Sequence, residues 1–212
     1  MHAYLVEWST LMVVFAIAAI TPGADFALIL RQALVYGRKN AFVTSFGIGL
    51  ALLFHVSYTI LGLGLLISKS LIAFNIVKWL GVSYLLYIGI KSITSRSIAG
   101  FTKENQKRSK TRQTMKKAFL AGFTVNILNP KAVFFFLSIF STLVAPATPM
   151  AVKFSYGLSM STMLVGWFPL VSIFMTTPAI RSLYQRAAKW IDRLCGAIFI
   201  ALSVRLMFQK VS

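Results

Sequence analysis

Six long apolar runs constrain the fold of this chain more than any other feature of its sequence. Each is long enough for a helix to cross a hydrocarbon core about 30 Å thick, which takes roughly 20 residues. The runs lie near 8–30, 41–67, 72–93, 118–145, 149–177 and 190–208. With 58% hydrophobic and 12% charged residues among 212, the chain has little left for a soluble domain. We therefore predict an all-α integral membrane protein with six transmembrane helices.

The basic residues are distributed unevenly between these runs. Sixteen of the 22 lysines and arginines lie in 31–40, 91–117 and 178–193, and five lie in the segments that alternate with them. This alternation follows the positive-inside rule, so we expect the three basic segments inside the cytoplasm and both termini outside it. The stretch 103–117 is interpreted as a solvated linker attracted to anionic membrane lipid, and no nucleic-acid partner is expected.

An internal repeat divides the chain into two halves. A shift of 108 residues aligns TPGADFAL, which begins at Thr21, with NPKAVFFF, which begins at Asn129, and matches Pro22 with Pro130. A second similarity pairs KWLG at 78–81 with KWID at 189–192. Because three spans are an odd number, the second half must enter the membrane in the opposite sense.

The predicted architecture is therefore one transmembrane domain over residues 1–212, built from two inverted three-helix repeats. Repeat A covers about 8–93, the basic cytoplasmic linker covers 94–117, and repeat B covers about 118–208. Helices 1 and 4 should be broken at Pro22 and Pro130, since proline lacks an N–H group and crowds the preceding turn. The freed backbone groups must face protein, water or substrate. Matching breaks in inverted repeats point to a secondary transporter with its binding site near the membrane midplane.

Asp25 follows the first break and is one of only four acidic residues. A carboxylate within a span is costly and usually functional, so Asp25 is a candidate for the substrate ammonium or a coupled proton. The alternative is an interfacial acid paired with Arg31 or Lys131. Lys131 could in turn neutralise Asp25, meet a substrate carboxylate, or extend to the interface.

The remaining candidate residues surround the two breaks or lie in the second span. Asn126 and Asn129 either bind a substrate ammonium through their amide oxygens or cap the backbone freed at Pro130. His55 titrates near neutral pH and could carry the proton, or it could be a packed, hydrogen-bonded core residue. The predicted substrate-binding or proton-coupling residues are Thr21, Pro22, Gly23, Asp25, His55, Asn126, Asn129, Pro130 and Lys131.

Four segments carry a resemblance to a known family. They read TPGADF (21–26), GRKNAFVTSFGIGL (37–50), GFTVNILNPKAVFFF (122–136) and YQRAAKWIDRLCGAIF (184–199). Together they resemble the homoserine/threonine exporter branch of the lysine-exporter (LysE) superfamily, over about 8–208. Family members often have Pro-Gly-Pro before the acid, where this chain has Ala24, which softens the break without moving Asp25.

The resemblance implies a bacterial inner-membrane transporter that exports small amino acids and is driven by proton antiport. Threonine or homoserine is the favoured substrate, although leucine-type, cysteine-type and basic substrates occur in the wider superfamily. The size leaves room for a homodimer. The alternatives are a proton-coupled exporter of another cation or small metabolite, and a channel.

No catalytic or metal-binding motif is evident in the sequence. It contains no phosphate-binding Gly-Lys-Ser/Thr loop and no His-Glu-x-x-His, and its single cysteine and two histidines are too few for a dedicated metal site. We therefore expect no enzyme activity, no metal and no cofactor. Asp192, which lies between Lys189 and Arg193, is interpreted as part of an ion pair at the cytoplasmic membrane face.

Overall fold

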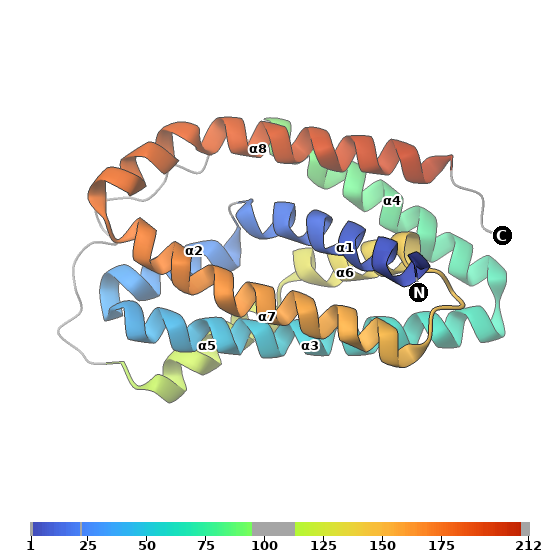
Figure 1. Ribbon diagram of the computed structural model, residues 1–212, viewed down its shortest axis with the longest axis horizontal. Coiled ribbons are helices and arrows are strands. Elements are labelled where there is room, and N and C mark those ends of the chain that lie inside the picture. The colour runs from blue at the N-terminus through green and yellow to red at the C-terminus, as the bar shows by residue number, and fades with distance from the viewer. Residues whose placement is uncertain (1, 22, 95–112, 209–212) are drawn as a thin grey trace.

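The computed structural model describes residues 2–21, 23–94 and 113–208, and every regular element in these ranges is helical (Figure 1). The α-helices are α1 (His2–Ile20), α2 (Ala24–Arg31), α3 (Arg38–Lys69), α4 (Leu71–Thr94), α5 (Met115–Ile127), α6 (Pro130–Leu143), α7 (Met150–Met175) and α8 (Pro178–Met207). A stretch of π-helix, η1 (Gln32–Tyr36), joins α2 to the turn before α3. Gly37 forms that turn with φ at 92°, a left-handed conformation that favours glycine.

Several of these helices are suited to a lipid environment. Within the described ranges, α1, α3, α4 and α7 contain segments long and apolar enough to span a membrane, and α5 with α6 would make a fifth if the bent pair is one span. Their outward faces carry large exposed apolar side chains, such as Leu61, Leu158 and Phe174. The predicted sixth span, 190–208, coincides with the second part of α8, which ends at Met207, and the full arrangement of six spans remains a prediction.

The long helices run side by side along the bundle, with α5 and α7 packed against α3, and α6 and α8 packed against α4. Glycine allows the closest approaches. At the contact between α3 and α5, Gly47 faces the carbonyl of Phe119, and Gly122 faces the carbonyl of Thr44. The Thr44 hydroxyl also donates to the Ala118 carbonyl at 3.0 Å. A side chain at either glycine would collide with the backbone of the opposite helix, so this contact fixes where α5 lies.

A similar contact joins α4 to α8. A Cβ atom on Gly89 would lie 2.9 Å from the Gly196 carbonyl oxygen, and one on Gly196 would lie 2.6 Å from the Gly89 carbonyl oxygen. Real Cβ atoms do not approach backbone this closely, so both positions require glycine. The contact holds the middle of α8 against α4.

Both predicted helix breaks are present. The first lies between Ile20 and Ala24, where Gly23 has extended backbone with φ −156° and ψ −170°. Pro22, to which this break was attributed, lies outside the described residues. The second lies between α5 and α6, whose axes differ by 59°. Pro130 is the first residue of α6, a position where its missing N–H group costs nothing.

The N-terminal half of α1 is hydrogen-bonded through Glu7 to the connection between α6 and α7 and to the start of α7. Its carboxylate accepts hydrogen bonds from the Ala145 amide at 3.0 Å, the Thr148 hydroxyl at 2.9 Å and the Tyr156 hydroxyl at 3.1 Å. These charge-assisted bonds stabilise α1 at the end of the bundle where it begins. The C-terminal end of α8 also lies at this end of the bundle (Figure 1).

Candidate functional site

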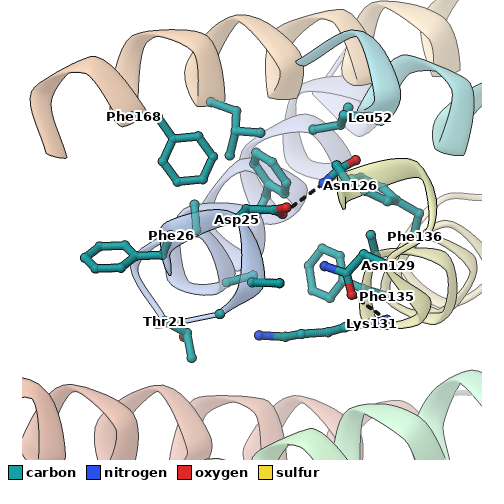
Figure 2. A pocket seen from close by; sticks show the side chains of 17 residues that line it. Thr21, Asp25, Phe26, Leu52, Asn126, Asn129, Lys131, Phe135, Phe136 and Phe168 are labelled. Carbon is teal, nitrogen blue, oxygen red and sulfur yellow. Dashed lines mark hydrogen bonds between the residues drawn. The ribbon is translucent and has the colours of Figure 1, made fainter. Parts of the chain in front are cut away.

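A pocket lies where the two helix breaks meet, with an empty volume of about 610 Å³ that is partly open to solvent. One side is formed by residues at the start of α2, and the opposite side by residues around the start of α6 (Figure 2). Segments more than 100 residues apart in sequence thus share one cavity.

Asp25 and Asn126 join the two breaks directly. The Asn126 amide nitrogen donates to Asp25 Oδ2 at 2.9 Å, as the dashed line in Figure 2 shows. Asp25 lies in the first turn of α2, and Asn126 lies in the last turn of α5. The alternative pairing of Asp25 with Arg31 is not observed, because the Arg31 guanidinium is exposed and lies 5.8 Å from the centre of the Tyr36 ring.

The same two side chains also present unpaired oxygen atoms. Asp25 Oδ1 and Asn126 Oδ1 are both buried and have no hydrogen-bond partner among the described residues. Leaving a buried polar group without a partner costs about 1–3 kcal/mol, and more when the group is charged. Both oxygens lie on residues that line the pocket. Two acceptors, one of them on a carboxylate, are suited to a ligand with several N–H donors and a positive charge.

Groups suited to an anion lie on another side of the pocket. A Cβ atom placed on Gly23 would lie 3.6 Å from the Lys131 ammonium, so this cation is beside the start of α2. Lys131 itself is in the first turn of α6. The first N–H groups of α2 have no side-chain cap, whereas α6 begins with Pro130 and its next N–H groups bond to Asn129. The helix dipoles of α2 and α6 both add positive potential there.

The walls between these polar groups are apolar. They are formed by aromatic and aliphatic side chains from α1, α3, α6 and α7, namely Phe15, Leu52, Phe135, Phe136, Leu164 and Phe168. The sequence analysis did not identify these residues, because an apolar side chain in an apolar span carries no distinguishing signal. A ligand in this pocket would meet a carboxylate and an ammonium group at its polar end, and apolar side chains around the rest of the molecule.

Two of the predicted residues line the pocket and have local structural roles. The Asn129 side chain accepts a hydrogen bond from the Lys131 backbone amide at 3.0 Å, so Asn129 is the N-cap of α6. The Thr21 hydroxyl donates to the Ile17 carbonyl at 2.8 Å, which is a bond within the last turn of α1. Both residues shape the breaks, while Asn126 is the asparagine that contacts Asp25.

His55 lies behind the pocket and does not line it. Its side chain is fully buried, and its ring stacks on Phe136 with ring centres 5.8 Å apart. Nε2 is 3.0 Å from the Asn126 carbonyl, which can only accept, so Nε2 carries the hydrogen and Nδ1 is left to accept from the Tyr58 hydroxyl. His55 therefore hydrogen-bonds to the last turn of α5, and both of its ring nitrogens have a partner.

The family profile of the LysE type translocator matches residues 16–210, which is nearly the whole chain and includes both breaks. The chain belongs to this family. Its match to a threonine efflux protein of Salmonella typhi is 28% identical over 206 residues, covering 97% of this chain and 100% of that protein. The threonine efflux protein of Escherichia coli (strain K12) is 27% identical, covering 97% and 100%.

A homoserine/homoserine lactone efflux protein of Salmonella typhi is 26% identical, with coverage of 87% of this chain and 83% of that protein. No solved structure matches the chain. Membership of a translocator family and the exposed apolar helices together identify a multi-pass membrane protein of a bacterial family. Among the described residues, no group of three or more histidine, cysteine, aspartate or glutamate side chains could hold a metal ion.

Proposed function

We propose that this LysE-family protein exports small amino acids, threonine or homoserine in the first place, from the cytoplasm in exchange for protons. The observation that carries the proposal is the pair of unpaired acceptors, Asp25 Oδ1 and Asn126 Oδ1, buried where the two helix breaks meet. A primary ammonium group supplies three donors and one positive charge. It would satisfy both oxygens at once.

The rest of an amino acid fits the other sides of the pocket. Its carboxylate would lie near the Lys131 ammonium and the N-termini of α2 and α6, which favour negative charge. A small side chain would lie against the apolar walls. The efflux of threonine and of homoserine by the named relatives supports this choice of substrate class.

Exchange for protons follows from competition for one carboxylate. A proton bound to Asp25 removes the negative charge that an ammonium needs, so the two cations exclude each other. A proton from outside would displace the amino acid, and the next amino acid from the cytoplasm would displace the proton. This is the simplest form of antiport, and it requires neither catalysis nor a cofactor.

The substrate test is efflux from vesicles that contain the purified protein. Vesicles loaded with labelled threonine, homoserine, leucine or lysine are placed in medium of equal or lower pH. We expect saturable efflux of threonine and homoserine that accelerates in the acidic medium and loses this acceleration when a protonophore is added. Efflux that rises linearly with concentration would indicate a channel. Efflux of solutes without an ammonium group at the same rate as threonine would contradict the proposed site.

The inverted repeat and the membrane orientation form part of the same proposal. Both breaks open into one pocket, as a pseudo-two-fold axis in the membrane plane would place them. α3, α5 and α8 begin at the end of the bundle opposite the start of α1 (Figure 1), and Lys39 and Lys116 are in the first turns of α3 and α5. This clustering supports a cytoplasmic location for that end and an outside location for both termini.

Orientation is tested by single cysteines in a Cys195→Ser background. We expect an impermeant thiol reagent to label Ala3→Cys in cells whose outer membrane is permeabilised. It should label Asn105→Cys only after the inner membrane is opened. Lys116→Cys serves as a second cytoplasmic site near the start of α5. Labelling of position 105 from outside would contradict the proposed topology.

A further inference from the structure

Asp192 was interpreted as part of an ion pair between Lys189 and Arg193, but no ion pair with either residue is present among the described residues, and the acid is buried. Its side chain is 5% exposed, whereas the flanking Lys189 and Arg193 are exposed. The Arg193 guanidinium lies 5.4 Å from the centre of the Trp190 ring. Asp192 is thus a buried acid on the inner side of α8, and the site described above does not use it.

The position of α8 places this acid beside the first helix break. The Tyr184 ring stacks on Phe26 of α2 with ring centres 5.3 Å apart, and Cys195 Sγ lies 3.8 Å from the Ile17 carbonyl of α1. These two contacts are on either side of Asp192 along α8. The segment 184–195 therefore runs past the break between α1 and α2.

Lys131 lies between this segment and the pocket. In Figure 2 its side chain extends along the edge of the pocket, with the pale red ribbon of α8 below it. The acids that interact electrostatically with its ammonium are Asp25 and Asp192. Lys91, near the end of α4, is the positively charged side chain that repels the Lys131 ammonium. One half-buried ammonium is thus within electrostatic reach of two carboxylates from different helices, α2 and α8.

The role of the Asp192 carboxylate follows from the balance of charge around the Lys131 ammonium. If Asp25 were the sole acid near Lys131, the lysine would neutralise it and compete with any incoming ammonium. A second carboxylate removes this competition, because the lysine then has a partner that is not needed for the substrate. We infer that Asp192 is the counter-ion of Lys131, which it holds on the α8 side of the break so that Asp25 remains available to the substrate ammonium. This inference rests on the proposed function, and it makes Asp192 a positioning residue that acts through Lys131.

The pair can be tested without any transport measurement, by comparing the thermal unfolding of purified variants in detergent. Lys131→Gln and Asp192→Asn should each lower the apparent Tm by about 5 °C or more, since each leaves a buried or half-buried charge without its partner. The double variant should recover most of this loss, because both charges are gone. Should a single variant fail to fold, the double variant is expected to restore folded protein. Additive losses in the double variant would overturn the pairing.

The positioning role is tested by the KM for efflux of the amino acid that the wild type transports. Asp192→Asn should raise KM about tenfold with little change in kcat, because Lys131 then turns toward Asp25. The double variant should have a KM no higher than that of Lys131→Gln alone, and Asp192→Glu should recover much of the wild-type value. Lys189→Gln and Arg193→Gln, on the exposed side of α8, are the matched controls and should leave KM unchanged. Losses that multiply in the double variant, or an unchanged KM in Asp192→Asn, would overturn the inference. If the wild type transports no amino acid, the proposed function fails, while the unfolding measurement still decides the pairing.

Discussion

Replacing Asp25 with asparagine is expected to abolish proton-driven efflux. The amide keeps the shape of the side chain and can still bond to Asn126, but it carries no charge for an ammonium and cannot accept a proton at physiological pH. Removing one partner of a buried, hydrogen-bonded charge pair costs about 2–5 kcal/mol, so we expect a loss of about 30-fold or more in kcat/KM. Efflux from vesicles under an imposed proton gradient measures it.

The control for this variant is an acid in the basic linker 94–117 that lies outside the described residues. Glu104→Gln removes the same charge from the basic linker and should transport like the wild type. Weak uncoupled exchange by Asp25→Asn is compatible with the account, because the amide retains some hydrogen bonding. Normal acceleration of its efflux by an acidic medium would show that the proton is carried elsewhere.

The second large effect is expected from Gly47→Ala in α3. The new methyl group would overlap the Phe119 carbonyl oxygen and lie 2.8 Å from the Phe123 amide nitrogen. Both are backbone atoms of α5, so α5 must move away as a whole, and it carries Asn126 with it. Overpacking of this kind costs about 1–3 kcal/mol, and a collision with backbone belongs at or above the upper end. We expect a marked loss of folded protein and of threonine efflux.

Gly62→Ala provides a matched control within the same helix. A Cβ atom at Gly62 would meet nothing within 4 Å. Alanine favours helix by roughly 1 kcal/mol over glycine, so this variant should be as stable as the wild type or more stable. Equal melting temperatures for the two variants, measured in detergent, would mean that α3 and α5 do not approach as closely as described.

The polar part of the site could be predicted from the sequence because polar residues stand out in apolar spans. Asp25, Asn126 and Lys131 were identified in this way, and the repeat indicated that the two breaks would lie near each other. The hydrogen bond between Asp25 and Asn126 shows that these two side chains meet, which the sequence analysis did not predict. Which asparagine caps α6 and which contacts the acid depends on the geometry of one turn, and spacing alone did not decide it.

Other features depend on packing, which a single sequence does not encode visibly. His55 stood out as a titratable residue, yet its hydrogen bond to the Asn126 carbonyl and its stacking on Phe136 appear only once α3, α5 and α6 are assembled. Asp192 was interpreted from its charged neighbours in sequence, whereas its position on the inner side of α8 leaves it buried. The repeat of KW at the start of spans three and six marked this region without indicating the role of the acid.

The central claim is that an amino acid and a proton exclude each other at the pocket of Asp25 and Asn126. It is tested most directly by measuring proton release when the amino acid transported fastest is added to purified protein in weakly buffered detergent. At a pH low enough for the carboxyl group to hold its proton, the account predicts release of about one proton per amino acid bound, and none from Asp25→Asn. Binding without proton release in the wild type, or equal release from Asp25→Asn, would contradict it.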